Sequence, residues 1–100
     1  MADLAVRGIV RIFFEECPHT LAEIRQALST SDSALLRRAA HTLKGSAAIF
    51  GAQQVVDAAF RLEMMGRENN LAPAAAAFER LESRTESLLD AVRVACDAKG

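Results

Sequence analysis

One histidine of this chain is well placed for nucleophilic chemistry. His41 lies in a segment whose apolar residues recur at helical intervals, and on a helix it falls about 160° from Leu43. Because the apolar stripe must face the interior, His41 is expected to project from the opposite side. An exposed, neutral imidazole can attack an electrophile such as a phosphoryl group.

Small residues surround His41 on the same face of this helix. Ala34, Gly45 and Ala48 are expected to leave a flat surface from which the imidazole protrudes. Glycine in a helix interior costs about 1 kcal/mol relative to alanine, and alanine is abundant in this chain. We therefore expect Gly45 to allow close approach of a partner, with Ala34 and Ala48 in the partner-binding surface.

Positive side chains lie within about one helical turn of His41. Arg37 precedes it by four residues, Arg38 precedes it by three, and Lys44 follows it by three. Helical side chains at these spacings are neighbours, and cations so placed disfavour a further positive charge on the ring and stabilise an anion bound to it. Lys44 is the strongest candidate for contacting such an anion. Arg38 points more to one side, where it is solvated or borders the partner-binding surface.

A carboxylate is expected on the inner side of the next helix. Glu63 falls about 40° from Ala59, within an apolar stripe, where an unpaired charge would cost on the order of several kcal/mol. One candidate partner is the Nδ1–H of His41, which would leave Nε2 free to attack an electrophile. The other is Arg67, four residues further along the same helix. The spacing alone favours neither partner.

The elements that must position these residues are helices. Pro18 suits a first helical turn, Gly51 suits a left-handed helix end, and Asn69 interrupts the apolar pattern. Helices are predicted at residues 4–16, 18–29, 32–50, 52–67 and from 73 to near the C-terminus. Short connections make successive helices antiparallel. We therefore predict an all-α, up-down-up-down four-helix bundle with an additional short N-terminal helix. This makes a single domain over residues 1–100, with a core bundle at about 18–98.

Composition and charge exclude several classes of protein. The chain of 100 residues is 51% hydrophobic with a net charge of -1, which gives no general attraction to nucleic acid or membrane surfaces. It has no apolar run long enough to cross a membrane and no signal-peptide pattern. Cys17 and Cys96 lie far apart, and a metal or redox site at Cys17 and His19 lacks further ligands. We expect a cytoplasmic domain with reduced thiols and no metal or cofactor.

The segment around His41 resembles the histidine-containing phosphotransfer (HPt) domain of multistep bacterial phosphorelays. The residues that carry this likeness are His41-Thr42-Leu43-Lys44-Gly45-Ser46, with Arg38-Ala39-Ala40 before them and Phe50-Gly51-Ala52 after them. The resemblance implies a four-helix bundle in which His41 is phosphorylated on Nε2, Lys44 lies near the phosphoryl group and Gly45 lets a receiver domain approach. It also matches Glu63 to a position that is Gln or Glu in many relatives, and Arg67 to one that is often basic.

The resemblance implies reversible transfer between a receiver-domain aspartate and His41, by a carrier without its own ATP site. The implied partners are response-regulator receiver domains and a hybrid sensor histidine kinase, with Mg²⁺ held by the receiver. Two alternatives stay open. One is the phosphoacceptor domain of a chemotaxis-type kinase, which is similar in its histidine motif and often carries Glu at the position of Glu63. The other is a helical adaptor without chemistry.

Overall fold

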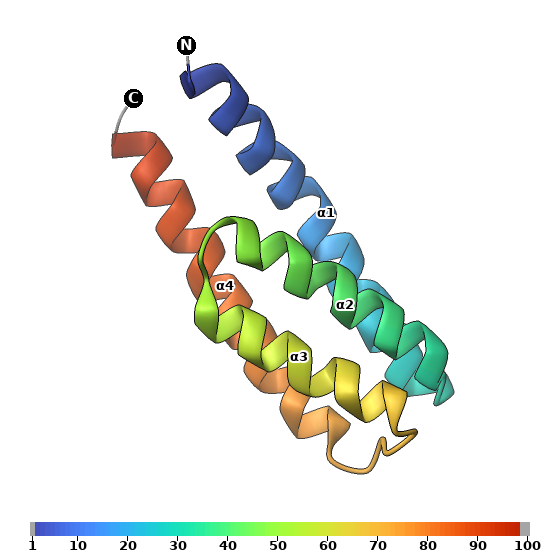
Figure 1. Cartoon of the computed structure of the whole chain (residues 1–100). Helices are drawn as coiled ribbons and strands as arrows, with labels where there is room; N and C mark the ends of the chain where they lie inside the picture. The colour runs from blue at the N-terminus through green and yellow to red at the C-terminus, as the bar shows by residue number, and fades with distance from the viewer. Residues whose placement is uncertain (1, 99–100) are drawn as a thin grey trace.

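Four helices make up the part of the chain that the structure describes (Figure 1). The computed structural model describes residues 2–98, with the side chains of residue 8 and residues 10–94. The helices are α1 (Ala2–Thr30), α2 (Ser33–Ile49), α3 (Gln53–Arg67) and α4 (Ala74–Ala98), with no strand in this range. Each helix packs against the next and α4 packs against α1, which closes a bundle. Successive helices run in opposite directions (Figure 1). The all-α prediction is confirmed.

The predicted helix boundary at Pro18 is wrong, and no separate N-terminal helix is present among the described residues. Residues on both sides of Pro18 belong to α1. A proline inside a helix removes a backbone hydrogen bond and costs about 3 kcal/mol. Here the continuous helix keeps Phe13 and Cys17 in one buried stripe with Leu21 and Ile24. Burial of an apolar side chain contributes about 1.5–3 kcal/mol, so this packing offsets the cost of the proline.

The helices end close to the predicted positions, for local reasons. Asp32 caps α2, because its side chain accepts a hydrogen bond of 3.0 Å from the backbone N–H of Leu35. Gly51 follows Phe50, the C-cap residue of α2, and has a left-handed φ of 64°. Asn69 follows Glu68, the C-cap residue of α3, and has a φ of 54°. These residues lie in the three connections of the bundle, and the short one at Gly51 joins α2 directly to α3.

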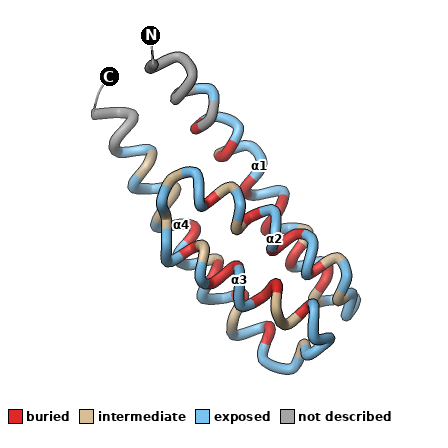
Figure 2. Tube along the Cα trace, in the orientation of Figure 1, coloured by how far each residue is buried: buried red, intermediate tan, exposed pale blue. Residues whose placement is uncertain are grey.

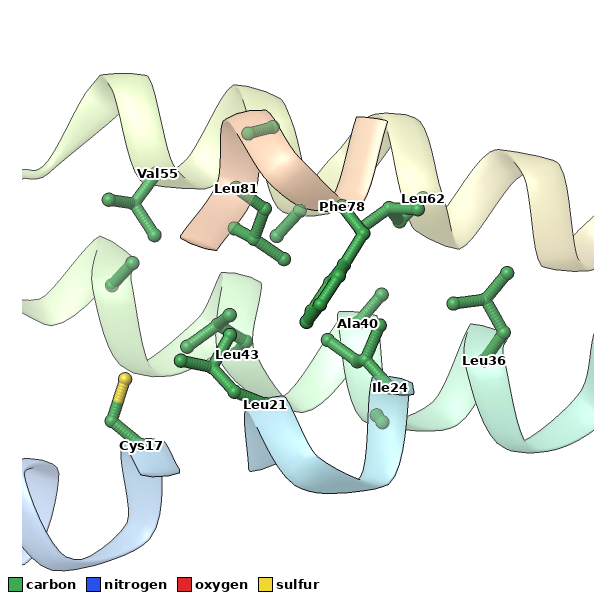
Figure 3. Packing of buried hydrophobic residues seen from close by; sticks show 14 of the residues in the cluster. Cys17, Leu21, Ile24, Leu36, Ala40, Leu43, Val55, Leu62, Phe78 and Leu81 are labelled. Carbon is green, nitrogen blue, oxygen red and sulfur yellow. The ribbon is translucent and has the colours of Figure 1, made fainter. Parts of the chain in front are cut away.

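The core is a single cluster of apolar side chains contributed by all four helices (Figure 3). The predicted apolar stripe of residues 32–50 is confirmed as buried at five positions, which are Leu36, Ala39, Ala40, Leu43 and Ala47. Its sixth predicted member, Phe50, is only half-buried, because it is the C-cap residue just beyond the end of α2. Buried and exposed residues alternate along α2 and α3 in Figure 2, as amphipathic helices require. None of the helices in residues 2–98 is both long and apolar enough to cross a membrane.

Cys17 belongs to this core and is 2% exposed. Burial raises the pKa of its thiol to about 11, so the thiol stays protonated and unreactive near neutral pH. His19 lies on the exposed side of α1, with its Nε2 atom 3.8 Å from Glu23. The side chain of Cys96 lies outside the described residues.

Candidate functional site

His41 projects into solvent from α2. Its side chain is 67% exposed, whereas Ala40 and Leu43 on the other side of the helix are buried. The 3.6-residue repeat of α2 produces this division, because the apolar positions turn inward together. The structure therefore places the imidazole where a partner can reach it.

The buried carboxylate of Glu63 contacts the inner nitrogen of His41. Glu63 lies on α3 with 4% of its side chain exposed, and its Oε2 is 3.0 Å from Nδ1 of His41. An ionised carboxylate only accepts hydrogen bonds, so Nδ1 must carry the hydrogen and donate. In the neutral ring, Nε2 then presents its lone pair on the side away from Glu63.

Lys44 and Arg67 bring two further positive groups to the same carboxylate. The Lys44 ammonium lies 2.7 Å from Oε1 of Glu63, and the Arg67 guanidinium lies 3.7 Å from Oε2. The two partners left open by the spacing, His41 and Arg67, therefore both contact Glu63. Lys44 is the closest of the three, and sequence reasoning had placed it only near His41.

These contacts decide the ionisation of Glu63. Burial by itself raises the pKa of its carboxyl group, but the ammonium of Lys44 and the imidazole of His41 outweigh burial and bring the pKa below its usual value. The side chain is therefore an anion at neutral pH. An ionised carboxylate at this place favours the Nδ1–H form of His41 and holds Lys44 beside it.

Phe60 is a site residue that the sequence analysis missed. The Lys44 nitrogen lies 5.1 Å from the centre of the Phe60 ring, a distance at which a cation is attracted to an aromatic face. Phe60 is 48% exposed and precedes Glu63 by three residues, on the same side of α3. This three-residue spacing is the feature of the sequence that could have indicated that Phe60 lies beside Glu63. Lys44 is thus held between a carboxylate and an aromatic ring.

Three small residues lie on the exposed helix face around His41. Ala34, Gly45 and Ala48 are all exposed, and a Cβ atom added at Gly45 would meet nothing within 4 Å. Packing inside the protein therefore does not require glycine at this position. Glycine leaves this part of the exposed surface without a side chain, although it lowers the intrinsic stability of the helix.

Gly66 has the opposite role, at the contact between α2 and α3. A Cβ atom at Gly66 would lie 2.7 Å from the backbone nitrogen of Arg37 and 2.8 Å from the carbonyl oxygen of Ser33. Only glycine allows the two backbones to approach this closely. This approach lies one helical turn from Glu63, and it keeps α2 and α3 near enough for the contact with His41.

Arg37 and Arg38 are exposed and form no ion pair with a described residue. The structure does not bring either of them to Glu63. The backbone carbonyl of Arg38 accepts a hydrogen bond of 3.0 Å from the Thr42 hydroxyl. Both guanidinium groups remain available to a partner at the edge of the exposed face.

The chain matches the model of a known protein family. The family model described as "Hpt domain" matches residues 8–95, which is most of the chain and includes every residue of the site described above. No curated protein and no solved structure matches the chain significantly.

Proposed function

The chain belongs to the Hpt domain family, and from that premise we propose that His41 is the residue that carries the phosphoryl group. Hpt domains are histidine phosphotransfer carriers of phosphorelays, not kinases. The observation that supports His41 is its contact with Glu63: an exposed imidazole has its Nδ1 bound to a buried carboxylate. His19 has no such partner among the described residues, because the nearby Glu23 is 39% exposed and 3.8 Å away.

Transfer is proposed to proceed by direct attack of Nε2. The Nε2 lone pair forms a bond to phosphorus of the receiver's aspartyl phosphate, and the bond from phosphorus to the aspartate oxygen breaks, which returns a carboxylate to the receiver. Nδ1 keeps its hydrogen throughout. The ring gains positive character as the N–P bond forms, and Glu63 stabilises it through the 3.0 Å contact. The reverse steps pass the group to another receiver.

Lys44 is proposed to compensate the charge of the phosphoryl group. Its ammonium is on a flexible four-carbon chain and is 2.7 Å from Glu63 before phosphorylation. A phosphoryl group on Nε2 would offer it three further anionic oxygens. Any Mg²⁺ is expected in the acidic pocket of the receiver, and the chain itself is proposed to have no ATP site or cofactor.

The exposed face of α2 is proposed as the receiver-binding surface. Hpt domains interact with receiver domains and histidine kinases. In this chain the small side chains of Ala34 and Ala48 and the bare backbone of Gly45 give such a partner close access to His41. Arg37 and Arg38 would lie at the rim, where charges steer association more than they strengthen it. We propose that the domain and its partners act in the cytoplasm.

A second candidate is supported by the identity of residue 63. The phosphoacceptor domains of chemotaxis-type kinases resemble this chain in their histidine motif and often carry Glu at the matching position, and here Glu63 contacts His41. Both candidates use His41, and the phosphate donor separates them. A phosphorylated receiver would label a relay carrier, whereas ATP with a separate kinase catalytic domain would label the other type.

The proposed role of His41 is tested by phosphoryl uptake from candidate phosphorylated receivers. Wild type and His19→Gln should become labelled, whereas His41→Gln should not. His41→Gln removes a side chain that is 67% exposed, so thermal unfolding should change by no more than the roughly 0.5 kcal/mol typical of surface substitutions. Continued labelling of His41→Gln, or loss of labelling in His19→Gln, would overturn the assignment.

A further inference from the structure

A groove between α3 and α4 carries positive charge that the bundle does not neutralise. It has a volume of about 410 Å³, and its walls include Arg61 of α3 together with Arg80 and Arg84 of α4. Among the described residues that line it, Asp57 is the one carboxylate. None of the three arginines forms an ion pair with any residue of the described range.

The neighbouring acidic groups leave an excess of positive charge. Asp57 already accepts a hydrogen bond of 2.7 Å from the side-chain amide of Gln53. An adjoining depression is lined by Glu79 together with Arg80 and Arg84. The groove and the depression together therefore contain three guanidinium groups and two carboxylates.

The other seam that α4 forms, with α1, is different. There Arg25 of α1 forms an ion pair with Glu82 of α4, so its positive charge is neutralised by a residue of the same chain. The groove between α3 and α4 differs from this seam because its three arginines have no ion pair with a described residue.

The bottom of the groove, its floor, is lined by apolar side chains, two of which are alanines. Ala58 is 8% exposed, and Ala77 and Met65 are half-buried beside it. Two alanines leave space above the backbone, and methionine adapts to the shape of a bound side chain. An apolar floor below guanidinium groups suits a ligand with an apolar side chain between carboxylates, since Arg binds carboxylates with two parallel hydrogen bonds.

The spacing of the arginines fits a peptide. Arg80 and Arg84 are four residues apart on one side of α4, which places their Cβ atoms about 5–6 Å apart. Alternate side chains of an extended peptide are about 7 Å apart, within reach of two flexible arginines. We infer that the groove between α3 and α4 binds an acidic peptide segment of a partner protein, with its carboxylates on Arg80 and Arg84 and an apolar side chain on the alanine floor.

This site lies apart from the face that carries His41. The α3 residues that line the groove, such as Asp57 and Arg61, are centred about 150° around the helix from Glu63 and its neighbours. In agreement, α3 packs against α2 on one side and α4 on the other (Figure 1). A peptide in the groove therefore leaves the α2 face open, and the domain can hold one partner while it exchanges a phosphoryl group with another.

Fluorescence anisotropy with the intact chain tests this inference. The probe is a labelled short peptide with Asp at every second position and one central Leu; the control peptide has Asn in place of each Asp. The groove variant is Arg80→Gln/Arg84→Gln. The matched control variant is Arg11→Gln/Arg93→Gln, which removes the same charge from exposed positions outside the groove.

We expect the groove variant to weaken binding of the acidic peptide at least about tenfold, which corresponds to about 1.4 kcal/mol, and the control variant to change it less than about twofold. Both variants should keep the phosphoryl uptake of the wild type. Equal weakening in both variants, equal binding of the Asn peptide, or no binding to the wild type would overturn the inference. Stronger competition by single-stranded DNA than by unlabelled peptide would also overturn it, in favour of a nucleic-acid ligand.

Discussion

Glu63 organises the site at the scale of single residues. Its two carboxylate oxygens contact three cationic or hydrogen-bonding partners, which are His41, Lys44 and Arg67. The sequence predicts that Glu63 faces inward and needs a partner, because an unpaired carboxylate on an apolar stripe is costly. It could not predict that all three groups converge, since that depends on the separation and rotation of α2 against α3. The spacing of Phe60 from Glu63 can be read from the sequence, but its contact with Lys44 depends on the same arrangement of α2 and α3.

The orientation of the His41 ring is the first consequence to test. Nitrogen-resolved NMR of the neutral ring should show hydrogen on Nδ1 and a free Nε2, because Glu63 accepts from Nδ1 at 3.0 Å. Glu63→Gln should keep this tautomer, since its amide oxygen also accepts a hydrogen bond. Glu63→Ala should shift the population toward hydrogen on Nε2. An unchanged spectrum in Glu63→Ala would show that Glu63 does not set the tautomer.

At the scale of elements, two glycines have different surroundings. Gly45 faces open space on α2, whereas the backbone of α2 lies against Gly66 of α3. The helical periodicity predicts which side of a helix each glycine lies on. The chain is rich in alanine, so the composition indicates that glycine at these positions has a specific reason. The close approach at Gly66 could not be predicted, because it is a distance between two helices.

Paired substitutions check this division. Gly45→Ala should raise the free energy of unfolding by up to about 1 kcal/mol, the propensity difference in an exposed helix, and Gly66→Ala should lower it, because its Cβ atom would lie 2.7 Å from a backbone nitrogen. Gly45→Gln should slow transfer from a phosphorylated receiver without loss of stability. Urea denaturation and a transfer time course measure the two effects. A wild-type transfer rate in Gly45→Gln would show that the exposed surface at Gly45 is not needed for access to His41. A wild-type free energy of unfolding in Gly66→Ala would show that α2 and α3 do not need glycine at their contact.

At the scale of the whole molecule, local signals predict most of the architecture. Gly51 and Asn69 mark connections that the structure confirms, because a left-handed backbone depends on residues close in sequence. The helix boundary predicted at Pro18 is wrong because it rests on a local cost alone. Burial of Phe13 and Cys17 in a core built from distant segments outweighs that cost. Tertiary packing therefore decides the length of α1.

The ionisation of Glu63 links the site to the stability of the whole bundle. Its pKa is lower in the folded state than its ordinary value, so its stabilising contribution is present above about pH 4.3, the usual Glu value, and is lost as pH falls through the folded-state pKa. The difference in free energy of unfolding between wild type and Glu63→Gln should be largest near neutral pH and shrink on acidification. Urea denaturation from about pH 7 to about pH 3 measures it. A difference that grows toward low pH would contradict the assigned direction of the shift.

The most direct test of the central claim is the location of the phosphate on the phosphorylated chain. After incubation with a phosphorylated receiver, mass spectrometry that preserves phosphohistidine identifies the residue, and phosphorus–proton correlation NMR identifies the ring nitrogen. Because Glu63 occupies the Nδ1 side of the ring, phosphate is expected on Nε2 of His41. Phosphate on Nδ1 of His41, on His19 or on any other residue would contradict the account.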